Sequence, residues 1–176
     1  MKALIITGKY AQDVEVFYPL YRMQEEGWDV DIVVPDEVTQ LGVYGMKITP
    51  TAAFPTMDEV DRYGLIVLPG GARAMEYLRQ EIKILDILGY FHSTGKPIGS
   101  ICHGTQLLIS AGLVKGRKVS GYYSIKDDIV NAGGEFVDAP FVTDDRITCS
   151  PHYKYLGQWM REVIKQAYYY HDAKSV

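Results

Sequence analysis

Short apolar segments alternate with amphipathic ones along this chain, and this alternation limits its possible folds more than any other feature. Residues 2–7, 29–34, 64–68 and 96–101 are apolar runs of strand length. The stretches between them carry apolar side chains at helical spacing. Strand and helix in turn are typical of βαβ units, in which helical crossovers join parallel strands. The pattern therefore predicts an α/β protein with a mostly parallel sheet.

The remaining segments complete a three-layer arrangement. We expect helices from residue 13 to Gly27 and at 81–91, 103–111, 125–131 and 153–170, shorter strands at 118–120, 135–137 and 146–150, and a hairpin at 42–45. No repeat or linker interrupts the pattern, so residues 1–176 are expected to form one domain. The predicted fold is a doubly wound, flavodoxin-like three-layer sandwich, whose sites lie at the carboxyl ends of the strands.

Composition and charge argue against several classes of function. The net charge of −4 argues against a nucleic-acid partner, and no apolar run approaches the roughly 18 residues that span a bilayer. Two cysteines are too few for a disulfide framework, which favours a cytoplasmic location. The four histidines show no metal-ligand spacing, and we expect neither a metal nor another cofactor.

One cysteine stands where chemistry is expected. The segment Ser100-Ile101-Cys102-His103-Gly104 joins a predicted buried strand to a predicted helix. A tight turn there would form a nucleophile elbow that points Cys102 at a helix N-terminus. The helix amides and dipole favour an anion, so a partly ionised thiolate is expected at neutral pH. The alternative is a small buried cysteine that only fills space under the sheet.

These residues resemble a known family. The Cys102 segment is similar to the nucleophile segment of the PfpI family of intracellular cysteine peptidases, which includes glyoxalase-like and Parkinson-disease-protein-like members. That family belongs to the class I glutamine amidotransferase-like superfamily. Further segments that resemble it are Asp13-Val14-Glu15, Leu68-Pro69-Gly70-Gly71, Arg73-Ala74-Met75-Glu76, Ile125-Lys126-Asp127-Asp128 and Asn131-Ala132-Gly133. The resemblance covers nearly the whole chain and implies the fold described above.

The resemblance also implies catalytic roles. A protonated Glu15 would hydrogen-bond the thiolate and later protonate the substrate, whereas by itself it is a first-turn glutamate that complements a helix dipole. His103 would act as the general base, paired with a carboxylate of the adjacent subunit that maps onto Glu76. Without that partner, Glu76 is a solvated surface charge. The Gly70-Gly71 turn and the amides of Gly71 and His103 would bind an oxyanion.

Departures from the family pattern concern substrate binding. Tyr122 matches a Tyr-Pro pair of the family, but Tyr123 replaces the proline. His152 stands in a segment where the family commonly has an Arg-x-Pro-like run. These side chains could narrow a pocket toward a small ligand, or they could be ordinary loop substitutions.

The sequence therefore predicts an enzyme in which Cys102 forms a covalent intermediate with a small-molecule or peptide substrate. Hydrolysis of amide or peptide bonds and glyoxalase or deglycase chemistry on reactive carbonyls share the same early steps. A hydratase or lyase acting on one metabolite is an alternative, as is a non-catalytic redox sensor with an oxidisable Cys102. The implied assembly is a homodimer or homohexamer with shared sites.

Overall fold

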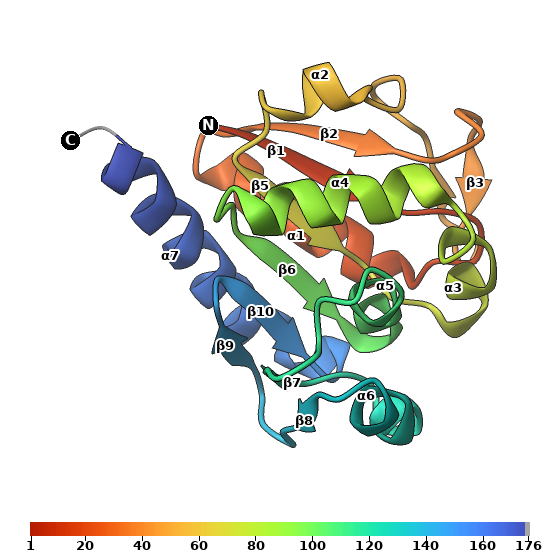
Figure 1. Cartoon of the computed structure of the whole chain (residues 1–176). Coiled ribbons are helices and arrows are strands. Elements are labelled where there is room, and N and C mark those ends of the chain that lie inside the picture. Colours follow the sequence, from red (N-terminus) through yellow and green to blue (C-terminus); the bar gives the residue numbers. More distant parts are fainter. Residues whose placement is uncertain (175–176) are drawn as a thin grey trace.

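The computed structural model describes residues 1–174 and places six strands in one twisted sheet (Figure 1). The strands are β1 (Lys2–Ile6), β2 (Asp29–Val33), β5 (Leu65–Leu68), β6 (Ile98–Ile101), β9 (Val142–Asp144) and β10 (Ile147–Ser150). Their order is β2-β1-β5-β6-β10-β9. Every pairing is parallel except that of β9 with β10. The expected α/β sandwich with a mostly parallel sheet is confirmed.

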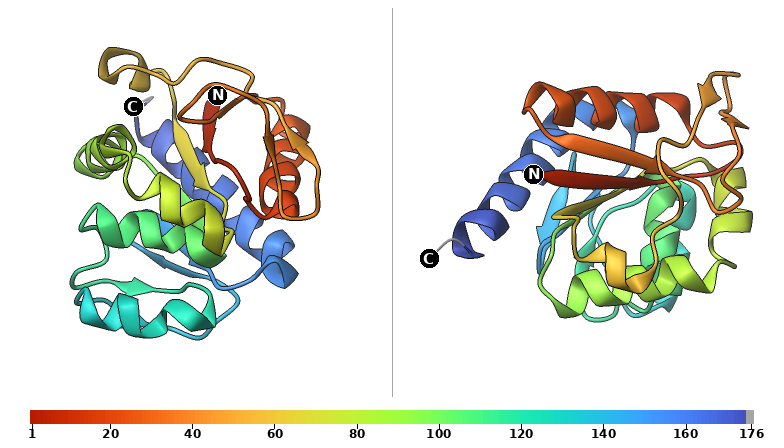
Figure 2. Two further views of the ribbon diagram at one scale, coloured as in Figure 1. Left: turned by 90° about the vertical axis from the view of Figure 1, so that its right-hand side faces the viewer. Right: turned by 90° about the horizontal axis from the view of Figure 1, so that it is seen from above.

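Helices cover both faces of this sheet (Figure 2). On one face α1 (Asp13–Glu25) packs beside α7 (Leu156–Lys174), and on the other lie α4 (Ile82–Ser93) and α5 (Thr105–Ser110). The shorter helices are α2 (Met57–Val60), α3 (Ala72–Leu78) and α6 (Lys126–Asn131). None of the helices in residues 1–174 has the length and apolar character needed to cross a membrane.

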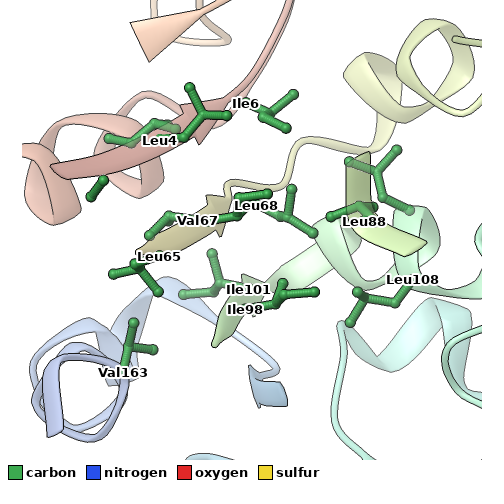
Figure 3. Close-up of a cluster of buried hydrophobic side chains, with 14 of the residues drawn as sticks. Leu4, Ile6, Leu65, Val67, Leu68, Leu88, Ile98, Ile101, Leu108 and Val163 are labelled. Carbon is green, nitrogen blue, oxygen red and sulfur yellow. The ribbon is translucent and has the colours of Figure 1, made fainter. Parts of the chain in front are cut away.

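The core forms because the central strands are apolar on both sides. All residues of β5 and β6 are buried, and Figure 3 shows their side chains meeting others from β1, α4, α5 and α7. Each buried Leu or Ile contributes about 1.5–3 kcal/mol. Gly99 allows α7 to approach β6, since a Cβ there would lie 2.9 Å from Val163 Cγ2.

Some segments differ from the sequence-based expectation. The strands expected at 118–120 and 135–137 are β7 (Lys118–Val119) and β8 (Glu135–Phe136), which form a separate two-stranded parallel sheet. The hairpin at 42–45 is confirmed, with β3 (Gln40–Leu41) pairing antiparallel to β4 (Lys47–Ile48). The helix expected around Glu76 is α3, whereas α2 and β9 were not predicted because both are short and their apolar patterns are weak.

Candidate active site

Cys102 follows β6 directly, at a sharp turn in the chain. Its φ is +58°, a left-handed value that is uncommon for a residue with a side chain. A 3₁₀ turn over Cys102–Gly104 then leads into α5. Gly104 is required at this turn, because a Cβ there would collide with the Leu68 carbonyl oxygen. Cys102 lies at the strand end and is only 7% exposed. Backbone strain such as its left-handed φ is common at functional sites.

Two backbone amides face the sulfur of Cys102. The N–H groups of Gly71, which follows β5, and of His103 both hydrogen-bond the thiol and act to lower its pKa. Gly71 has a φ of +109°, and a Cβ at this position would lie 2.6 Å from the Tyr10 carbonyl oxygen. Glycine is therefore needed there for the amide to reach the sulfur. The same pair of donors can hold a negatively charged oxygen that forms next to Cys102.

Glu15 reaches this site from the first turn of α1. Its side chain is fully buried, and its Oε2 accepts a hydrogen bond of 2.7 Å from the Gly70 amide. Burial raises the pKa of Glu15 to about 7, against the opposing effects of the Gly70 amide and the Cys102 thiol. Its Oε1 is buried without a hydrogen-bond partner in residues 1–174. This oxygen can carry the proton that the raised pKa implies.

The thiol itself does not ionise as readily as its place at a helix start suggested. Burial raises the pKa of Cys102, and an ionised Glu15 raises it further. Two negative charges in this buried region repel each other strongly, so the pair retains at least one proton near neutral pH. Protonation of Glu15 removes a charge that raises the pKa of Cys102 and so makes the thiolate easier to form. The sequence-based expectation of a partly ionised thiolate at neutral pH took no account of burial or of the Glu15 charge, both of which oppose ionisation.

The His103 ring lies against the sulfur. Nδ1 is 3.3 Å from the Cys102 sulfur, and Nε2 is 3.1 Å from the hydroxyl oxygen of Ser124. Burial lowers the pKa of His103, so its ring is neutral at pH 7 and can accept a proton. Ser124 was not identified from the sequence. Its place two residues after Tyr122 is the only signal that could have drawn attention to it.

An open cavity of about 610 Å³ leads to Cys102. Its walls come from segments that follow β1, β5, β6 and β10, together with the hairpin and the Tyr122 segment. The lining residues are Tyr10, Gln12, Val43, Gly71, Ala72, Arg73, Cys102, His103, Tyr122, His152 and Tyr153. The site thus lies at the carboxyl ends of the parallel strands, where this type of sheet binds ligands.

Tyr122 and His152 form an aromatic wall of the cavity. The Tyr122 ring centroid lies 4.8 Å from that of His103 and 5.9 Å from that of His152. Tyr123 touches the Tyr122 ring but is 74% exposed and does not line the cavity. Of the three side chains considered for substrate binding, the structure therefore brings two to the site.

Glu76 stands apart from these residues. It is exposed on α3 and does not line the cavity beside Cys102 of its own chain. A role for this carboxylate at His103 would require a second subunit and stays a prediction. The described part of the chain also contains no group of three or more His, Cys, Asp or Glu side chains that could hold a metal ion.

A mostly parallel sheet that presents a strained cysteine between a buried carboxyl and a neutral histidine defines an α/β protein with a nucleophile elbow. Residues 1–166 match the model of the DJ-1/PfpI family, and the chain belongs to this family. Several of its relatives carry the names of enzymes, which supports an enzyme of the DJ-1/PfpI type.

Two relatives and one solved structure illustrate this membership. "Deglycase PfpI" of Pyrococcus furiosus is 41% identical over 167 residues, which cover 94% of this chain and 98% of that protein. "Protein/nucleic acid deglycase 2" of Escherichia coli is 32% identical over 93% of this chain and 95% of that protein. The structure of Schizosaccharomyces pombe DJ-1 superposes with a TM-score of 0.85 over the full length of both chains, at 16% identity. At that identity the likeness supports the fold.

Proposed function

We propose that this chain is a cysteine-dependent enzyme that attacks small reactive carbonyl compounds, or the adducts they form with amino and thiol groups. The observation that carries the proposal is the arrangement around one sulfur. Cys102 opens onto the cavity with a neutral His103 at 3.3 Å and a Glu15 carboxyl whose pKa is about 7. A nucleophile, a proton acceptor and a proton donor are therefore available together at neutral pH.

A 1,2-dicarbonyl compound illustrates the steps. The reactive form pairs a Cys102 thiolate with a protonated Glu15. The sulfur bonds to the aldehyde carbon, the carbonyl π electrons move to its oxygen, and this oxygen takes the proton from Glu15. Until then the Gly71 and His103 amides hold the developing negative charge.

His103 serves the second half of the reaction. Its neutral ring accepts the hydrogen of the attacked carbon as a proton and delivers it to the neighbouring ketone oxygen, which gives an enediol. The enediol rearranges to a thioester with Cys102. Water then breaks the S–C bond, releases a 2-hydroxy acid and returns a proton to Glu15. One carbon is oxidised and its neighbour is reduced, so water is the only co-reactant.

The size of the cavity favours this class of substrate over folded polypeptides. About 610 Å³ suits a small molecule or a single modified side chain. The deglycase names of the two relatives point the same way. Hydrolysis of an amide would begin with the same attack by Cys102, and a screen of peptide amides beside dicarbonyls separates the two activities.

Turnover of methylglyoxal to lactate tests the proposal. Cys102→Ser should lose activity by at least about 100-fold, because a serine hydroxyl in this site is a far poorer nucleophile. The matched control is Cys149→Ala, since Cys149 is fully buried in β10 and does not line the cavity. Equal turnover by wild type and Cys102→Ser would rule out the cysteine mechanism.

We also propose that Glu76 completes the site in a neighbouring subunit. An exposed carboxylate on α3 is free to meet the His103 of a second chain, where it would stabilise the protonated ring. Mixing inactive Cys102→Ala chains with inactive Glu76→Ala chains should then restore part of the activity. A fully active monomer, measured by light scattering, would contradict the shared site.

A further inference from the structure

Arg73 is the one permanently charged side chain among the described residues that line the cavity. The other lining groups are apolar, aromatic or uncharged at neutral pH, and Glu15 lies behind Cys102 and is fully buried. The cavity of a single chain therefore presents a positive charge with no carboxylate of its own in the lining. The charge of the cavity lining is thus opposite in sign to the net charge of the chain, which is −4.

The guanidinium of Arg73 stacks on an aromatic ring and keeps its hydrogen-bonding capacity. It lies over the Tyr10 ring, with its central carbon 4.0 Å from the ring centroid. Within residues 1–174 it makes no ion pair and no hydrogen bond to a protein acceptor. A stacked arginine loses part of its freedom of motion while its N–H groups remain available to a ligand.

Tyr10 is itself held in an unusual conformation. Its φ is +63°, in the left-handed region that bulky residues seldom adopt, and its amide donates a 2.9 Å hydrogen bond to the Leu41 carbonyl. Tyr10 and Cys102 are thus two residues with left-handed backbones that both line the cavity. Strain of this kind persists where the surrounding structure requires it, commonly at ligand sites.

Gln12 adds a second polar group with unused capacity. It lines the same cavity between Tyr10 and α1, and its Oε1 is buried without a hydrogen-bond partner in the described residues. This oxygen can therefore accept a hydrogen bond from a ligand hydroxyl. A buried polar atom without a partner costs free energy until a ligand or water forms a hydrogen bond with it.

We propose that Arg73, stacked on Tyr10, forms an anion-binding subsite that selects carbonyl substrates with a carboxylate at the end remote from the reacting carbon. This rests on the proposed carbonyl chemistry of Cys102 and names the substrate class for it. Arginine matches the geometry of a carboxylate with two parallel N–H groups, which neutral dicarbonyls cannot use. The preferred substrates are therefore dicarbonyl compounds that carry a carboxylate.

Two dicarbonyls of almost equal size test this selection. 4,5-Dioxopentanoate and 2-oxopentanal share the reacting carbons and differ by a carboxylate in place of a methyl group. Wild type should have the higher kcat/KM for the anion. Arg73→Gln should lower the ratio of the two kcat/KM values by about 10-fold or more, mainly through the KM of the anion. Arg73→Lys should keep only part of the preference.

Arg62→Gln is the matched control. Arg62 also lies over a tyrosine ring, with its central carbon 5.1 Å from the Tyr63 ring centroid, and its removal changes the net charge equally. Arg62 lies in the turn before β5, whereas Gly71 follows the other end of that strand. Its loss should leave the ratio unchanged. A ratio that Arg73→Gln does not change, or that both variants lower equally, would overturn the subsite while leaving the carbonyl activity intact.

A second measurement decides the case in which neither dicarbonyl is turned over, which would refute the proposed function. Iodoacetate and iodoacetamide both alkylate Cys102 by forming an S–C bond with loss of iodide, and only iodoacetate is charged. The ratio of their rates should fall about threefold or more in Arg73→Gln, because an opposite charge nearby concentrates the anion. An unchanged rate ratio would overturn the anion-binding subsite whatever reaction Cys102 performs.

Discussion

The Glu15 carboxyl and the Cys102 thiol lie together in a buried region beneath the cavity, and burial raises the pKa of both groups. Glu15 comes from the start of α1 and Cys102 from the end of β6, so the sheet brings together two residues that are 87 positions apart in the sequence. An ionised Glu15 raises the pKa of the Cys102 thiol, whereas the hydrogen bond with that thiol lowers the pKa of Glu15. The reactivity of the sulfur should therefore follow the protonation state of Glu15.

Glu15→Gln should change how stability depends on pH. The folded-state pKa of Glu15 is about 7, above its ordinary value of 4.5, so the folded protein binds a proton that the unfolded chain releases. In wild type this contribution is complete below pH 4.5 and is lost as the pH rises through 7. The difference in free energy of unfolding, variant minus wild type, should therefore rise by up to about 3 kcal/mol as the pH goes from 4.5 to 8. Urea unfolding at pH 5 and pH 8 measures this difference, and a constant difference would contradict a buried, titrating Glu15.

Iodoacetamide should label Cys102 much faster than Cys149 near pH 7. Burial raises the pKa of both thiols, but only Cys102 opens onto the cavity and receives the Gly71 and His103 amides. In Glu15→Gln the labelling of Cys102 at pH 8 should become several-fold faster, because the variant removes the charge that raises the thiol pKa. Mass spectrometry of the two peptides gives both rates. Equal labelling rates for the two cysteines would contradict a reactive Cys102 and indicate a cysteine that only packs in the core.

Ser124 should act as a positioning residue for His103. Its hydroxyl is 3.1 Å from Nε2, on the side of the ring away from the sulfur. Ser124→Ala should lower kcat by about 3- to 10-fold with little change in KM, because the ring loses the contact that orients Nδ1. Ser124→Thr should restore most of the loss, since it keeps the hydroxyl. Tyr123→Phe serves as a neighbouring control outside the cavity, and an equal loss in that variant would argue for a general disturbance of the turn.

Much of this architecture could be predicted from the sequence, because apolar runs and glycine-rich strand ends are local signals. The buried β5 and β6 and the turns that follow them are examples. The contact of Ser124 with His103 depends on how a 3₁₀ turn at Tyr123–Ile125 packs beside the elbow, which no local pattern reports. The stacking of Arg73 on Tyr10 likewise depends on a left-handed backbone that tyrosine rarely adopts.

The electrostatics of the site were the hardest part to predict. At a helix start the helix dipole by itself favours the thiolate form of a cysteine, and this local effect can be inferred from the sequence. The opposing effects are burial and the nearby Glu15, and both arise only when α1 and β6 pack together. Because burial raises the pKa more than the two amides lower it, the tertiary fold decides the resting state of Cys102.

Gly70 should tolerate no side chain, and a comparison with a second glycine can show this. A Cβ at Gly70 would lie 2.7 Å from Glu15 Oε2 and 2.8 Å from both the Cys102 Cβ and the His103 amide nitrogen. Gly70→Ala should therefore cost about 1–3 kcal/mol of stability and displace three groups of the site at once. We expect activity to fall further than the loss of stability explains, because the Glu15 carboxyl also loses its contact with the Gly70 amide.

Gly89 is the matched position, since it lies within α4 and a Cβ there would meet nothing within 4 Å. Gly89→Ala should stabilise the protein by about 0.5–1 kcal/mol, because alanine is the better helix former, and it should leave turnover unchanged. Thermal unfolding and methylglyoxal turnover of both variants complete the test. The opposite signs expected for the same chemical change isolate the close packing around Gly70 as the cause. A Gly70→Ala protein with wild-type stability and activity would show that Glu15, Cys102 and His103 are not packed as tightly as described.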